Sequence, residues 1–200
     1  MEKIICIFGA SSTWGAWDYE KGGWVNRLRL YLDSKDSDIF LYNLGVSGDT
    51  TKDLLKRFDC ECKARKPDLL IFSIGDNDSI YIPSEKKNLV SLTQFEINFE
   101  NLISKAKKYS KDIIFLGFKK IDENKTTPIP WKTEYHYTNE YINLYDKKLE
   151  SICKKNKVQY LKMYDLLQNK DFEDGLHPNT SGHQKMYLKI KSYLVKNKLI

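Results

Sequence analysis

Residues 4–15 read IICIFGASSTWG, an apolar run that passes directly into a turn rich in glycine and serine. The apolar run is typical of a buried strand, and the small polar residues after it are typical of a strand-to-helix turn. Backbone N–H groups in such a turn suit an anion. However, the turn lacks the lysine of a P-loop, the three-glycine spacing of a dinucleotide site and the second glycine of a G-x-S-x-G elbow. The turn alone therefore does not assign a function.

The rest of the chain continues this pattern, with strand-like and helix-like segments in alternation. Strands are predicted at 4–8, 39–43, 69–74, 113–117 and 158–161, and helices at 23–32, 51–63, 92–109, 138–155 and 181–197. Alternation of this kind favours a parallel sheet covered by helices on both faces. The sequence therefore predicts an α/β fold, a three-layer α/β/α sandwich around a five-stranded, doubly wound, flavodoxin-like sheet.

The length and composition fit one domain that spans residues 1–200, since 41% of the residues are hydrophobic. The first apolar run is too short for a signal peptide or a membrane span, which favours a cytoplasmic protein. The formal net charge is +6, and 29 Lys against 4 Arg carry the positive charge, scattered over helix faces. Scattered lysines indicate solvated surfaces, so no nucleic-acid partner is predicted, and the oligomeric state is left open.

The four cysteines do not form a metal-binding pattern. Cys6 and Cys153 lie in apolar segments and are predicted to be buried thiols. Cys60 and Cys62 are separated by one residue rather than two, and no second Cys or His pair accompanies them. The sequence therefore predicts no metal site.

Two further strand-end loops carry small polar residues. NLGVSGDT at 43–50 follows the second strand, and a backbone N–H of this loop could face an anion or simply begin the next helix. SIGDNDS at 73–79 follows the third strand, where Asn77 could donate its amide N–H to a developing oxyanion or cap a helix. Each loop on its own leaves both interpretations open.

The segment DGLHPN at 174–179 carries the most informative histidine. His177 precedes a proline, which favours extended backbone rather than a helix interior, and Asp174 lies three residues upstream across a glycine. This spacing lets a carboxylate fix the imidazole tautomer, as the third member of a catalytic triad does. His136 and His183 have no acidic partner at such a spacing and are predicted to be structural or incidental.

Taken together, the four loops resemble the SGNH (GDSL-like) hydrolases, whose four blocks supply Ser, Gly, Asn and His in this order along the chain. The resemblance covers residues 9–177. It implies that Ser11 is the nucleophile, that His177 is the base and that Asp174 is its acidic partner. It also implies an oxyanion hole formed by the N–H groups of Ser11 and Gly48 and the side chain of Asn77, with no cofactor.

Such hydrolases act on small acyl and acetyl esters, carbohydrate esters, lysophospholipids and thioesters, and the resemblance implies a small-molecule ester substrate. One residue departs from the pattern, because Ala10 stands where the family has Asp in its Gly-Asp-Ser block. This departure motivates one alternative, a catalytically inactive SGNH-type domain that binds glycans. A flavodoxin-like module that binds a phosphate or nucleotide at residues 9–15 is the other.

The residues that shape a substrate pocket are less clearly marked. Trp14 and Trp17 follow the proposed nucleophile and are predicted to line the pocket together with Asp78, whereas Trp24 is predicted to pack in the core. The long irregular stretch at 119–137 is interpreted either as a lid or pocket wall or as a surface loop.

Overall fold

A computed structural model describes residues 2–35 and 38–200 and confirms the predicted five-stranded parallel sheet. The strands of this sheet are β1 (Lys3–Gly9), β2 (Ile39–Gly45), β3 (Leu69–Ser73), β6 (Asp112–Leu116) and β7 (Gln159–Leu161). Their order across the sheet is β2-β1-β3-β6-β7, and every pairing is parallel. This is the doubly wound order of flavodoxin-like folds once the two short strands of a separate hairpin are set aside.

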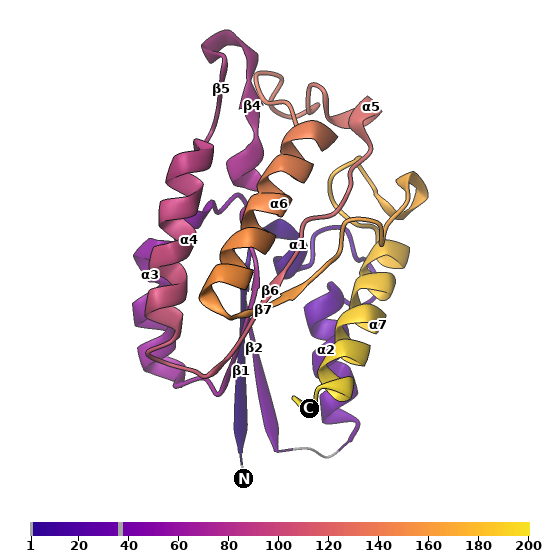
Figure 1. Ribbon diagram of the computed structural model, residues 1–200. Coiled ribbons are helices and arrows are strands. Elements are labelled where there is room, and N and C mark those ends of the chain that lie inside the picture. The colour runs from indigo at the N-terminus through magenta and orange to yellow at the C-terminus, as the bar shows by residue number, and fades with distance from the viewer. Residues whose placement is uncertain (1, 36–37) are drawn as a thin grey trace.

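Helices cover both faces of the sheet, so the fold has the three predicted layers (Figure 1). In Figure 1, α3, α4 and α6 lie on one side of the strands, and α2 and α7 lie on the other. The helices are α1 (Ser11–Trp14), α2 (Trp24–Asp33), α3 (Thr51–Arg65), α4 (Leu92–Ala106), α5 (Glu123–Thr126), α6 (Asn139–Asn156) and α7 (Thr180–Lys196). Ser, Thr or Asn side chains cap the amino ends of α3, α4, α6 and α7.

Two hydrophobic cores lie between these layers because successive side chains of a strand point to opposite faces of the sheet. In β1, Cys6 and Phe8 pack in the core under α3, α4 and α6, and Ile5 and Ile7 pack in the core under α2 and α7. Trp24 is fully buried in the second core, as predicted. Full burial of side chains of this size stabilises the fold by about 1.5–3 kcal/mol each.

The carboxyl ends of the adjacent strands β2, β1 and β3 meet closely. Gly9 at the end of β1 is in register with Gly45 of β2 and with Ser73 of β3. The short helix α1 lies directly against these ends, since a Cβ atom on Gly45 would overlap the backbone of Trp14. Loops that leave these three strands are thereby brought to one edge of the sheet.

Some elements differ from the predictions. A hairpin of β4 (Tyr81–Ile82) and β5 (Lys87–Asn88) and the short helices α1 and α5 were not anticipated, because two to four residues carry too little periodicity to be recognised. The irregular stretch at 119–137 contains α5 and is joined to the hairpin by a bridge between Tyr81 and His136.

The cysteines and the helix lengths bear on the remaining predictions. Cys6 and Cys153 are fully buried, as predicted, whereas Cys60 is exposed and Cys62 is buried, so these two sulfurs face different surroundings.

Among residues 2–35 and 38–200, no helix has the length and apolar character needed to cross a bilayer. The cytoplasmic location stays a prediction.

Candidate active site

Three of the predicted site residues follow neighbouring strands of the sheet. Ser11 begins α1 just after β1, Gly48 lies in the turn after β2, and Asn77 begins a short 3-10 turn after β3. Since β1 pairs with both β2 and β3, these residues gather at one edge. All three line a cavity of about 360 Å³, together with His177 and Asp174.

The loop between residues 172 and 178 brings His177 to this edge from the far end of the chain. A bridge between Phe172 and Pro178 closes the loop, and the N–H of Glu173 donates to the carbonyl of His177 at 3.0 Å. Asn179 then caps α7 by accepting from the N–H of Gly182 at 3.1 Å. His177 is thus fixed between a closed loop and the start of a helix.

The side chains of Ser11, His177 and Asp174 form a continuous hydrogen-bonded chain. The Nδ1 atom of His177 lies 2.7 Å from Asp174 Oδ2, and its Nε2 atom lies 2.9 Å from Ser11 Oγ. A carboxylate only accepts, so Nδ1 carries the proton, and Nε2 of the neutral ring accepts the hydrogen of the Ser11 hydroxyl. This arrangement has the geometry that proton removal from a serine requires.

Four hydrogen bonds hold the Asp174 carboxylate. Its Oδ1 accepts from the N–H groups of Leu176 (3.0 Å) and His177 (2.8 Å), and its Oδ2 accepts from His177 Nδ1 and from the indole N–H of Trp17 (2.9 Å). Burial by itself raises the pKa of Asp174, but the bonds from His177 and Leu176 outweigh it and bring the pKa to about 2. Asp174 is therefore ionised at neutral pH and favours the Nδ1–H tautomer.

The cavity also contains N–H groups without a protein partner. Among the described residues, the backbone N–H groups of Ser11 and Gly48 meet no acceptor, and Gly48 has the left-handed backbone (φ +84°) that favours glycine. Asn77 donates one amide hydrogen to the carbonyl of Asp49 at 2.8 Å and accepts at Oδ1 from the Tyr137 hydroxyl at 2.7 Å. These two bonds fix the amide orientation and leave its second N–H for the cavity.

Three tryptophans surround this cavity. Trp14 and Trp17, the predicted pocket residues, line it with 60% and 43% of their surfaces exposed. Trp131 comes from the irregular stretch at 119–137, and its ring centroid lies 5.8 Å from that of His177. The stretch therefore contributes a wall of the cavity, which is one of the two interpretations that the sequence left open.

Asp78, which was predicted to line the pocket, does not reach it. Its side chain is fully buried and accepts hydrogen bonds from the backbone N–H of Thr51 (2.9 Å) and from the Thr51 hydroxyl. The prediction is wrong because consecutive residues of a 3-10 turn point in different directions. Asn77 faces the cavity, whereas Asp78 anchors the first turn of α3.

Burial raises the pKa of Asp78 to about 7, against the opposing effect of the hydrogen bonds from Thr51. Between about pH 4 and pH 7 the folded state then binds more protons at this carboxyl than the unfolded state, so stability falls as the pH rises through this window. We expect Asp78→Asn to remove this part of the pH dependence. Urea unfolding at pH 5 and pH 8 checks it, and an equal loss of stability in variant and wild type would contradict it.

The remaining candidate residues lie outside the cavity. His183 is fully buried, where its Nδ1 accepts from the N–H of Trp24 (3.1 Å) and its Nε2 donates to the carbonyl of Ala16 (2.8 Å). Burial lowers the pKa of His183 to about 4, so the ring is neutral and structural. His136 is half-buried beside Tyr81. Ser12, next to Ser11, is 7% exposed.

Three interactions at this site were not predicted from the sequence. Trp17 was expected to contact substrate, but its hydrogen bond to Asp174 was not foreseen. Tyr137 and Trp131 lie in the irregular stretch, where no periodicity indicates which side chains point inward. Their only sequence signal is the concentration of aromatic residues in a stretch too long for a simple connection.

The chain is similar to a known protein family and to several known proteins. The model of the family described as GDSL-like Lipase/Acylhydrolase matches residues 7–185. The uncharacterized lipoprotein YqeF of Bacillus subtilis is 31% identical over 110 residues, which are 52% of this chain and 44% of the relative. The acetylxylan esterase of Geobacillus stearothermophilus is 32% identical over 94 residues, which are 46% of this chain and 43% of the relative. The chain thus spans less than half the length of these two relatives.

Among solved structures, a lipase/acylhydrolase from Enterococcus faecalis superposes with a TM-score of 0.76 at 20% sequence identity. The superposition covers 96% of this chain and 95% of that chain. At this level of identity the likeness shows a shared fold, the same three-layer sandwich that the strand order indicates.

Proposed function

Because the chain belongs to the GDSL-like Lipase/Acylhydrolase family, we propose that it is a serine esterase that hydrolyses a carboxylic ester with a small acyl group. The observation that carries this proposal is the unbroken hydrogen-bonded chain from Ser11 through His177 to Asp174, at the wall of an open cavity. Binding of a phosphate would not require these hydrogen bonds between a serine, a histidine and an aspartate.

In the proposed reaction, His177 takes the hydroxyl proton of Ser11 as the Ser11 oxygen attacks the ester carbonyl. The negative charge of Asp174 stabilises the imidazolium that forms. His177 then gives its proton to the departing alkoxide, which leaves as an alcohol. A water molecule, deprotonated by His177 in turn, attacks the acyl-enzyme, and the carboxylic acid departs with Ser11 restored.

The tetrahedral intermediate carries a negative oxygen that needs hydrogen-bond donors. The N–H groups of Ser11 and Gly48 and the second amide N–H of Asn77 are the proposed donors, since all three residues line the cavity and these N–H groups meet no acceptor among the described residues. Because Tyr137 and the carbonyl of Asp49 already fix the Asn77 amide, its orientation requires little rearrangement during the reaction.

We expect Asn77→Ala to lower kcat by roughly 10²–10³-fold with a smaller change in KM, because an oxyanion donor acts mainly in the transition state. Steady-state kinetics with p-nitrophenyl acetate checks this. Asn88→Ala is the matched control, since Asn88 also donates its amide to a backbone carbonyl (Ser79, 2.9 Å) but lies outside the cavity. A change confined to KM in Asn77→Ala would make Asn77 a substrate-binding residue instead.

The preference for a small acyl group rests on the size of the space at Ser11. Three tryptophans line the cavity of about 360 Å³. A longer acyl chain would have to extend past Gly48 and Asn77 into an adjoining cavity of about 550 Å³. We expect kcat/KM for p-nitrophenyl acetate to exceed that for the decanoate. An optimum at long acyl chains would overturn the small-acyl proposal and indicate that the second cavity takes the chain.

The alternative of an inactive glycan-binding domain was motivated by Ala10. The Ala10 side chain is 4% exposed and packs in the core under α3, α4 and α6, while Ser11 and His177 remain in hydrogen-bond contact beside it. A fluorophosphonate probe with intact-mass detection separates the two functions. A stoichiometric adduct supports the esterase, and the absence of both adduct and turnover rejects it.

A further inference from the structure

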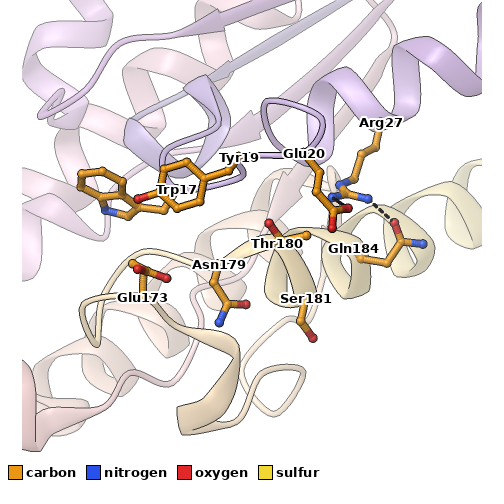
Figure 2. Close-up of a pocket in the computed structure, with 9 residues that line it drawn as sticks. All are labelled: Trp17, Tyr19, Glu20, Arg27, Glu173, Asn179, Thr180, Ser181 and Gln184. Atoms are coloured by element: carbon orange, nitrogen blue, oxygen red, sulfur yellow. Dashed lines mark hydrogen bonds and ion pairs between the residues drawn. The ribbon is translucent and has the colours of Figure 1, made fainter.

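Another cavity, of about 620 Å³ and distinct from the two described above, shares Trp17 with the cavity at Ser11 (Figure 2). We call it the Tyr19 groove and define it by Trp17, Tyr19, Glu20, Glu173 and Gln184. In Figure 2, Trp17, Tyr19 and Glu20 extend from the connection between α1 and α2, and Glu173 lies across from them on the loop that precedes α7. Its volume is within the range of about 300–1,000 Å³ that is typical of small-molecule sites.

Two exposed aromatic rings form one wall of the Tyr19 groove. Trp17 is 43% exposed and Tyr19 is 74% exposed, and their ring centroids lie 6.1 Å apart with the planes tilted by 46°. Trp17 is further held by its hydrogen bond to Asp174. Large aromatic surfaces left open to water beside an active cavity suit a ligand whose C–H groups pack on the ring faces.

The opposite wall is polar and carries no available positive charge. Arg27 is the one cation among the described residues that line the groove, and its side chain is 4% exposed. It is bonded through Nε and Nη2 to Asp18 and through Nη1 to the amide oxygen of Gln184 (2.6 Å), and its Nη2 also lies 3.6 Å from Glu20 Oε2. Gln184 is left with its NH₂ group as a donor, and Glu20 and Glu173 contribute carboxylates. A phosphate or carboxylate ligand would face repulsion here, whereas hydroxyl groups find both donors and acceptors.

The Tyr19 groove adjoins the cavity at Ser11 through Trp17, whose indole N–H donates to Asp174. Glu173 directly precedes Asp174, and the residues that begin α7 follow His177. In ester hydrolysis the base that deprotonates the serine also protonates the leaving oxygen, so the alcohol moiety lies next to His177. Neither Gly48 nor Asn77, the candidate oxyanion donors, lines the Tyr19 groove.

We propose that the Tyr19 groove binds the alcohol moiety of the substrate and that this moiety is a neutral carbohydrate, an inference that rests on the proposed esterase function. The C–H face of a sugar ring packs on Tyr19 and Trp17, and its hydroxyl groups pair with Glu173, Glu20 and Gln184. The groove therefore selects an acylated sugar over a lysophospholipid, whose phosphate would meet two carboxylates.

The test compares three acetyl esters with different alcohols: acetylated xylotriose, p-nitrophenyl acetate and acetylcholine. We expect Tyr19→Ala to lower kcat/KM for acetylated xylotriose about tenfold relative to p-nitrophenyl acetate, mainly through KM, and Tyr19→Phe to restore most of it because the ring is retained. Phe40→Ala is the matched control, since Phe40 is an exposed aromatic residue (49%) on β2 and does not line the groove.

Two outcomes overturn the inference while leaving the esterase proposal intact. One is that Tyr19→Ala and Phe40→Ala show the same ratio for acetylated xylotriose over p-nitrophenyl acetate. The other is that acetylcholine is the preferred ester and depends on Tyr19, which would make the groove a site for an organic cation held by rings and carboxylates.

Failure of the proposed function itself is recognised separately. If no ester is turned over, titration calorimetry with unacetylated xylotriose still examines the groove, because binding needs no Ser11 chemistry. Binding to the wild type that weakens about tenfold in Tyr19→Ala supports a carbohydrate site, and equal or absent binding in both proteins rejects it.

Discussion

Replacing Ser11 with alanine is expected to lower the esterase rate by roughly 10⁴–10⁶-fold and to abolish labelling by a fluorophosphonate. The Ser11 hydroxyl is the group that meets His177 Nε2, at 2.9 Å, and without it no acyl-enzyme forms. Hydrolysis by water held between the oxyanion donors would account for the remaining rate. Steady-state turnover of p-nitrophenyl acetate and intact-mass spectrometry of the labelled protein measure the two effects.

Ser12→Ala is the matched control, because Ser12 is adjacent in the chain and only 7% exposed. Neighbouring side chains in a turn point in different directions, so only one of the two serines faces the imidazole. We expect Ser12→Ala to keep turnover and labelling within about tenfold of the wild type. Peptide mapping identifies the modified residue, and an adduct on Ser12 would overturn the assignment of Ser11.

His177→Ala is expected to lower kcat by roughly 10⁶-fold, an effect comparable to that of Ser11→Ala. The two effects are similar because a catalytic serine and its histidine act as a unit. The variant lacks both the group that accepts the Ser11 proton and the group that protonates the leaving alkoxide. It also leaves Asp174 without the hydrogen bond from Nδ1 (2.7 Å), so the free energy of unfolding is to be measured alongside the kinetics.

His136→Ala is the control for this experiment. His136 is half-buried in the bridge to Tyr81 and does not line the cavity at Ser11, so its loss should leave most of the turnover. His183 is less suitable as a control because both of its ring nitrogens are bonded in the core, and its replacement would lower stability as well. Turnover of wild-type magnitude in His177→Ala would disprove its role as the base.

The fold was predictable because its strands and helices are long enough to display their periods. β1, β3 and β6 are short apolar runs, and α3 and α4 carry apolar stripes that face the sheet. Each predicted strand of the main sheet is present with ends shifted by at most two residues. The hairpin of β4 and β5 was missed because its two-residue strands are too short to show a period, and its bridge from Tyr81 to His136 joins residues that are fifty-five positions apart.

The site residues also fall into two groups, those that a local sequence pattern predicts and those that it does not. Ser11, Gly48 and Asn77 follow strand ends, and parallel strands bring such positions together whatever the intervening sequence. Tyr137 and Trp131 reach the cavity through contacts between distant segments, as does the bond of Trp17 to Asp174, and no local pattern encodes such contacts. Asp78 was misassigned because a one-residue step within a 3-10 turn decides between the cavity and the first turn of α3.

The distribution of the indole rings gives the protein an optical property. Of the four tryptophans, Trp14, Trp17 and Trp131 line the cavity at Ser11, and Trp24 alone is enclosed in the core. Intrinsic fluorescence from this chain therefore arises largely at the place where an ester would bind. One of these rings, Trp131, lies 5.8 Å from the ring of His177. Emission intensity should thus follow occupancy of the cavity, without any attached dye.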